Sequence, residues 1–145
     1  MSNITQITSF LRAVPLFRGL NNHQLEHLAK RMVEREYTSG QTIVSQGQGG
    51  EGIFIITEGS VTVQHENASG EKTEVNLFKP TDFFGELALL DDGPRTASVI
   101  ALEASKCFVL TRWDFLTVLR ENDAEMAINI LQELAKRFRR ALDAL

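Results

Sequence analysis

Residues 82–98 read Asp-Phe-Phe-Gly-Glu-Leu-Ala-Leu-Leu-Asp-Asp-Gly-Pro-Arg-Thr-Ala-Ser, and this stretch decides the fold. Gly85 lets the backbone approach a ligand closely, and the apolar run after it predicts a short helical turn with free N–H groups at its start. Such groups attract phosphate. Arg95 follows a turn at residues 92–94, and its guanidinium fork can bind two phosphate oxygens at once. The stretch therefore predicts a site for a small anion.

Glu86 lies in the same stretch and needs a different partner, because a carboxylate repels a phosphate. Its oxygens are suited to accept a hydrogen bond from a hydroxyl, such as the 2′-OH of a ribose. A phosphate and a ribose together indicate a nucleotide. Spacing alone leaves an alternative open, in which Glu86 and Arg95 form a ligand-free ion pair beside the turn.

The segments 84–89, Phe-Gly-Glu-Leu-Ala-Leu, and 94–99, Pro-Arg-Thr-Ala-Ser-Val, resemble the phosphate-binding cassette of cyclic nucleotide-binding domains. This family includes the regulatory subunits of cyclic-nucleotide-dependent kinases, the bacterial catabolite activator protein and the ligand domains of cyclic-nucleotide-gated channels. The resemblance extends over essentially the whole chain. It implies a regulatory domain that senses a cyclic nucleotide.

The resemblance also implies roles for single residues. Arg95 would hold the cyclic phosphate, Glu86 would hold the ribose 2′-OH, and N–H groups near Leu87 and Ala88 would complete the cradle. Thr96 would hydrogen-bond the phosphate or a guanine. The predicted ligand-binding residues are Phe84, Gly85, Glu86, Leu87, Ala88, Arg95, Thr96, Ala97, Leu134 and Phe138.

The length and composition are those of one soluble globular domain spanning residues 1–145. The chain has 43% hydrophobic and 23% charged residues, and no apolar run approaches the roughly 20 residues that a membrane span requires. Residues 1–8 lack the features of a signal peptide, which predicts a cytoplasmic location. The net charge of −4 argues against general nucleic-acid binding, which needs many cations.

The spacing of apolar residues predicts an α+β fold, an antiparallel β-roll of jelly-roll type between two sets of helices. Residues 1–35 have helical spacing, and Asn21 with Gln24 matches a helix capping box. Residues 36–111 read as short strands separated by turns, with the cassette at 82–99. Within them, Val75 and Leu77 alternate with polar neighbours. Residues 112–145 return to helical spacing.

The last predicted helix carries an apolar stripe at alternating steps of three and four residues, made up of Leu131, Leu134, Phe138, Ala141 and Leu145. The stripe either packs on the chain's own barrel or forms a dimer seam with a second copy. In the family that the chain resembles, a helix in this place often folds over the base. This implies a contact from Leu134 or Phe138.

The sequence favours a binding domain over an enzyme. Metal enzymes with a jelly-roll outline place two or three histidines on the roll, whereas His65 is the only histidine in the strand region. His23 and His27 have metal-compatible spacing, but no further ligand pattern accompanies them, so we expect no metal. Cys107 lies in an apolar run and is expected to be buried, which makes it a poor nucleophile.

Three ligand and partner hypotheses follow. We expect cAMP, because the lid region shows no acidic side chain placed for a guanine edge, although Thr96 alone does not decide between cAMP and cGMP. The alternatives are a cGMP-selective domain and a ligand-free protein interaction module. We expect ligand binding to move the final helix, and the domain to act on a protein partner or on its own dimer. Because the sequence ends at Leu145, before any helix-turn-helix segment, no direct DNA binding is expected.

Overall fold

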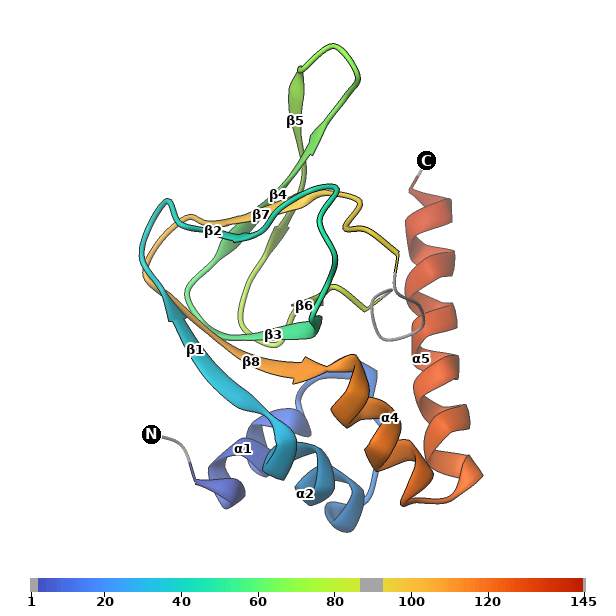
Figure 1. The fold of residues 1–145 in the computed structure, drawn as a ribbon. Coiled ribbons are helices and arrows are strands. Elements are labelled where there is room, and N and C mark those ends of the chain that lie inside the picture. The colour runs from blue at the N-terminus through green and yellow to red at the C-terminus, as the bar shows by residue number, and fades with distance from the viewer. Residues whose placement is uncertain (1–2, 87–92, 145) are drawn as a thin grey trace. The chain divides into compact units, whose positions relative to one another are not determined.

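The computed structural model describes residues 3–86 and 93–144, which form two compact units (Figure 1). The helical unit consists of Met1–Arg31 and Asp114–Leu145, and the sheet unit consists of Met32–Trp113. The predicted change from helices to strands and back to helices is therefore present. The first strand begins at Val33, earlier than the expected residue 36.

The sheet unit contains two four-stranded antiparallel sheets among its described residues. The first sheet has the order β1-β8-β3-β6, with β1 at Val33–Tyr37, β8 at Ser105–Thr111, β3 at Gly52–Glu58 and β6 at Phe83–Phe84. The second has the order β2-β7-β4-β5, with β2 at Thr42–Val44, β7 at Ser98–Ala101, β4 at Val61–Glu66 and β5 at Lys72–Phe78. This arrangement is a β-roll, so the predicted α+β fold is confirmed.

The core of the roll lies between the two sheets. Strand β3 carries the continuous apolar run Ile53–Ile56, which is buried on both faces, as expected for a central strand. Phe54 of this strand stacks on Phe84 of β6 with 5.0 Å between the ring centroids. Cys107 and Val109 of β8 join the same cluster. The core thus fixes the strand that leads directly into the glycine of the cassette, because Phe84 precedes Gly85.

The hairpin of β4 and β5 departs from the pattern of a buried sheet. It extends away from the rest of the sheet unit (Figure 1), and β5 is exposed along nearly its whole length. Val75 and Leu77 are both about half exposed. The alternation of apolar and polar residues in this segment therefore marks an edge strand without a buried face.

The helical unit contains α1 (Ile4–Leu11), the short 3₁₀ helix η1 (Pro15–Phe17), α2 (Asn22–Arg31), α4 (Arg112–Arg120, whose first residues belong to the sheet unit) and α5 (Ala124–Asp143). The predicted capping box of α2 is confirmed, because the Asn21 and Gln24 side chains each accept a hydrogen bond from the other's backbone N–H. Asp123 caps α5 by accepting from the Met126 N–H. None of the described helices is long and apolar enough to cross a membrane.

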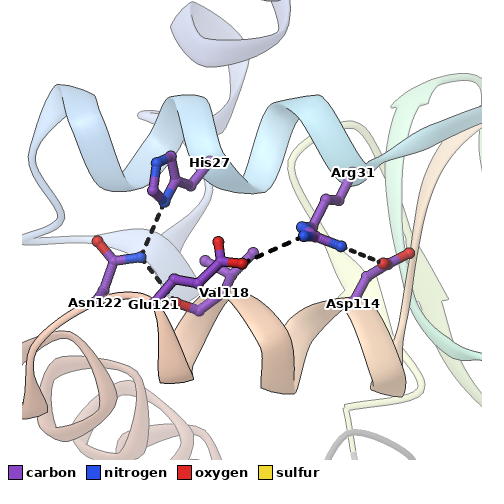
Figure 2. Close-up of polar contacts among 6 residues, drawn as sticks. All are labelled: His27, Arg31, Asp114, Val118, Glu121 and Asn122. Atoms are coloured by element: carbon purple, nitrogen blue, oxygen red, sulfur yellow. Dashed lines mark hydrogen bonds and ion pairs between the residues drawn. The ribbon is translucent and has the colours of Figure 1, made fainter.

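An ion-pair group joins α2 to α4 (Figure 2). Arg31 Nη1 donates to Asp114 Oδ1 at 2.9 Å, and Arg31 Nη2 lies 3.6 Å from Glu121 Oε1. These side chains are partly exposed, so each pair contributes less than about 1 kcal/mol, and the group acts mainly to fix the register of the two helices.

Farther along the same two helices, an uncharged contact joins α2 to Asn122, which follows α4 (Figure 2). The Asn122 amide nitrogen donates to the Val118 carbonyl at 2.8 Å and lies 3.1 Å from His27 Nδ1. Because an amide nitrogen only donates, the imidazole Nδ1 is the acceptor. His27 therefore has a structural partner in Asn122, which follows the end of α4.

Candidate ligand-binding site

The backbone of Arg95 is held by the glycine-rich turn at 47–52. Its N–H donates to the Gln48 carbonyl at 2.7 Å, and its carbonyl accepts from the Gly47 N–H at 2.8 Å. The neighbouring Pro94 forms an isolated antiparallel bridge with Gly49. The turn thus fixes the backbone of the arginine.

The Arg95 side chain is buried, with 9% of the residue exposed. Nη2 donates to the Gly52 carbonyl at 2.9 Å, and the guanidinium carbon lies 5.6 Å from the centre of the Phe54 ring. Nε is buried with no hydrogen-bond partner among the described residues. Burial lowers the pKa of Arg95, and the carboxylates of Glu51 and Glu86 oppose this shift. The result is a desolvated cation with unused donor capacity.

Gly85 lies directly against this guanidinium. Its φ of +85° is a conformation that side-chain-bearing residues rarely adopt, and a Cβ added there would lie 2.3 Å from Arg95 Nη1 and 2.6 Å from the Gly52 carbonyl oxygen. The positive φ and the lack of space for a Cβ each require glycine at this position. In this structure the backbone at Gly85 lies close to the arginine. Its close approach to a ligand stays a prediction.

A cavity of about 330 Å³ opens beside Arg95. Its walls come from β1, β2, β3 and the glycine-rich turn, and they include Arg35, Gln48, Gly49, Glu51, Phe54 and Arg95. The cavity combines one aromatic face with charged groups of both signs. It suits a ligand that has both an anionic group and a flat apolar part.

Comparison with known proteins identifies the fold family. The model of the cyclic nucleotide-binding domain matches residues 34–122 of this chain. The chain belongs to the cyclic nucleotide-binding domain family. The resemblance of the cassette is thereby confirmed, and the match includes the whole stretch from Phe84 to Val99.

Relatives of this cyclic nucleotide-binding domain come from bacteria and eukaryotes. The chain is 31% identical over 131 residues to the cyclic AMP receptor protein of Thermus thermophilus, covering 90% of this chain and 60% of that protein. It is 36% identical over 109 residues to the cAMP-dependent protein kinase regulatory subunit of Dictyostelium discoideum, covering 73% and 33%. The chain thus spans less than two thirds of the length of either relative.

Solved structures agree with this cyclic nucleotide-binding fold. The N-terminal domain of a transcriptional regulator from Streptomyces coelicolor superposes with a TM-score of 0.80 at 32% identity, covering 94% of each chain. The regulatory domain of Toxoplasma gondii PKA, crystallised with cAMP, gives a TM-score of 0.80 at 27% identity and covers 92% of this chain and 50% of that chain.

The structure brings together three predicted residues of the cyclic nucleotide-binding cassette. Gly85 touches Arg95, and Glu86 acts on Arg95 electrostatically. Phe84, also a cassette residue, is buried in the core. Thr96 is exposed, and Ala97 is half-buried on the approach to β7. The predicted positions Leu87 and Ala88 lie outside the described residues.

The two remaining candidates, Leu134 and Phe138, lie on α5 in the helical unit. Leu134 is buried and Phe138 is 40% exposed. The contact of either with a base stays a prediction.

Sequence reasoning missed Arg35, Glu51 and Gly52 as members of the site. They are more than forty positions from Arg95 along the chain and reach it only through the pairing of β1, β8 and β3. Glu51 carried one signal, because it is the only acidic residue in a turn that is otherwise glycine and glutamine. Its proximity to an arginine was not visible from the sequence.

The part of the chain that the structure describes shows neither a cluster of metal-ligating side chains nor an activated thiol. No group of three or more His, Cys, Asp or Glu side chains there is suited to hold a metal ion. Burial raises the pKa of Cys107 to about 12, so the thiol stays protonated at neutral pH. Cys107 therefore contributes to the packing of the core.

Proposed function

We propose that this domain binds a cyclic purine nucleotide, with cAMP as the ligand, and acts as a regulatory sensor without catalytic chemistry. The observation that carries the proposal is the buried guanidinium of Arg95, whose Nε has no partner among the described residues and whose surroundings form the wall of a cavity. A phosphate would satisfy that donor and neutralise the charge. Membership of the family supports the same ligand class.

Each cassette residue has a proposed role. Arg95 binds the cyclic phosphate, Glu86 accepts from the ribose 2′-OH, and Thr96 hydrogen-bonds the phosphate. N–H groups near Leu87 and Ala88 complete the cradle. These roles separate the ligand's anionic group from the Glu86 carboxylate, as electrostatics requires.

Ligand binding is proposed to change the position of the C-terminal helix, with Leu134 or Phe138 covering the base. Such a change is limited by the difference between the ligand's affinities for the two positions. The output passes to a protein partner or to a second copy of the chain, in the cytoplasm. Direct DNA contact is not part of the proposal, in keeping with the net charge of −4.

Calorimetric titration with cAMP and, separately, with cGMP tests the proposal. We expect saturable binding of one nucleotide per chain, with cAMP the tighter ligand. If cGMP bound more tightly, cGMP would be assigned as the ligand in place of cAMP, and the proposed site would stay the same. Binding of neither nucleotide would reject the proposal and favour a protein interaction module.

Glu86→Ala is expected to weaken cAMP binding by about 1 to 3 kcal/mol, because a hydrogen bond to a charged acceptor is lost. The same variant should bind 2′-deoxy-cAMP as the unmodified protein does, since that ligand lacks the hydroxyl. Glu71→Ala removes an equal charge from the exposed β4–β5 turn and serves as the control for titrations of both ligands. Equal affinity of the unmodified protein for both ligands would contradict the role of Glu86.

A second proposal concerns the surface of α5. The predicted stripe is divided in the structure, because Leu134 is buried while Leu131 and Phe138 are exposed, and Leu145 lies outside the described residues. The exposed large apolar residues Ile128, Leu131, Phe138 and Leu142 form a series with the exposed Ala135. Their steps of three and four residues are those of a coiled-coil seam. We propose a homodimer through this stripe, since a second copy would present the same spacing.

Leu131→Glu is expected to weaken that dimer by about 2 kcal/mol, or roughly 30-fold, because it places a charge in an apolar seam. Leu131 is 54% exposed, so the change should leave the monomer folded. Analytical ultracentrifugation measures the association, and Gln132→Glu, an exposed neighbour off the stripe, provides the same change in charge. A Leu131→Glu protein that dimerises as well as the Gln132→Glu protein would rule out this seam.

A further inference from the structure

Arg35 is a charged residue of β1 whose side chain lines the cavity and is 44% exposed. It lies opposite Cys107 in the antiparallel pairing of β1 with β8, and directly paired residues point to the same face of a sheet. Cys107 belongs to the core cluster, and Tyr37, two positions after Arg35, packs against that cluster. The Arg35 side chain accordingly lines the same cavity as Arg95.

The partner of Arg35 is Glu51. Arg35 Nη1 donates to Glu51 Oε2 at 2.8 Å. The Glu51 backbone is fixed as well, because its carbonyl accepts from the Arg112 N–H at 3.1 Å. Burial raises the pKa of the neighbouring Tyr37, and the charge of Arg35 opposes this shift. One guanidinium therefore holds the Glu51 carboxylate at the cavity wall.

Glu51 is also adjacent in sequence to a hydrogen-bond partner of the Arg95 side chain. The residue after it, Gly52, provides the carbonyl that accepts from Arg95 Nη2. Of the two carboxylates that act on the buried Arg95, Glu51 has the larger effect. Glu51 and the desolvated guanidinium line the same cavity, so the Glu51 carboxylate competes with any incoming anion, because both need the same donors and repel one another.

We propose that Arg35 is a positioning residue of the anion site: by binding the Glu51 carboxylate, it keeps that carboxylate from occupying Arg95 and leaves the Arg95 donors to the ligand phosphate. The inference rests on the proposed function, since it concerns the same site. It adds Arg35 of β1 and Glu51 of the glycine-rich turn to the cassette residues, although both are far from the cassette in sequence.

Titration of the ligand into four proteins tests the proposal, using whichever of cAMP and cGMP the unmodified chain binds more tightly. The proteins are the unmodified chain, Arg35→Met, Glu51→Gln and the double variant. Arg35→Met should weaken binding by about tenfold, a usual size for coupling between contacting charged groups. Glu51→Gln should bind at least as tightly as the unmodified chain. The double variant should recover affinity to within about threefold of Glu51→Gln, because no carboxylate remains to be restrained.

Two controls separate positioning from a general effect of charge or folding. Lys106→Met removes a cation from β8 whose partners, Glu36 and Glu58, lie outside the cavity lining, and it should bind like the unmodified chain. Arg35→Lys keeps a cation for Glu51 and should retain most of the affinity. Thermal unfolding of each variant reports on the fold, and Arg35→Gln takes the place of Arg35→Met if the latter does not fold.

The outcomes separate the two proposals. A double variant as weak as Arg35→Met would overturn the inference, because Arg35 would then contact the ligand itself or support the fold. Unchanged binding by Arg35→Met would also overturn it, while leaving the proposed function standing. Failure of the unmodified chain to bind either nucleotide would reject the proposed function and the inference with it.

Discussion

Arg95→Ala is expected to abolish measurable nucleotide binding, with an affinity loss of at least about 100-fold, or about 3 kcal/mol. Loss of one partner from a desolvated charge pair has this size, because the phosphate would be left without its counter-charge. Arg95 provides a buried cation with an unused Nε donor, and the described lining of the cavity has no second arginine that is free of a carboxylate partner. Calorimetric titration with cAMP and cGMP measures the loss.

The fold of the Arg95→Ala protein should persist. The variant removes one hydrogen bond to the Gly52 carbonyl and one contact with the Phe54 ring, but it also removes an incompletely paired buried charge. We expect its free energy of unfolding to stay within about 2 kcal/mol of the unmodified value. Arg95→Lys, which keeps the charge and loses the fork, should bind with intermediate affinity. Unchanged affinity in Arg95→Ala would place the site elsewhere.

Gly85→Ala should impair both the stability and the binding of the protein. The residue has a left-handed φ, and its new Cβ would collide with Arg95 Nη1 and the Gly52 carbonyl. The backbone must shift to relieve this overlap, so we expect a loss of about 2 to 4 kcal/mol in stability. The same shift displaces the guanidinium and should weaken nucleotide binding at least about tenfold, since such a site tolerates only small errors in position.

Gly40→Ala is the matched control for this substitution. Gly40 has a φ of +86°, nearly that of Gly85, but a Cβ there would meet nothing within 4 Å. Its cost should be that of the left-handed conformation alone, about 1 to 2 kcal/mol, with no effect on affinity. Chemical denaturation and titration of both variants separate backbone strain from the collision. Equal binding by the two variants would show that the contact between residues 85 and 95 is not needed.

Local sequence was sufficient to predict the parts of the site that lie close together along the chain. Gly85, Glu86 and Arg95 fall within one short stretch, and residue type alone fixes what each can donate, accept or tolerate. The capping box at Asn21 and the buried run of β3 are local in the same sense. Each depends on neighbours within a few residues, so a pattern can reveal it.

The parts that the sequence did not reveal depend on strand register. Arg35 reaches the cavity only because β1 pairs with β8 in a register that places residue 35 opposite Cys107. A shift of one residue would turn Arg35 to the other face of the sheet. The buried side of α5 was not evident from the sequence either, because heptad spacing does not distinguish the buried Leu134 from the exposed Leu131.

The β4–β5 hairpin has a consequence for engineering. Its turn closes on itself, since Asn67 Oδ1 accepts from the N–H groups of Ser69 and Glu71, and the surrounding side chains are exposed. None of the core cluster lies between residues 66 and 77. Extra residues inserted at this turn would add mainly loop-closure entropy, about 0.6 kcal/mol for each doubling of loop length. A fluorescent reporter placed there would leave Arg95 and its cavity untouched, which makes the turn an attachment point for following ligand binding optically.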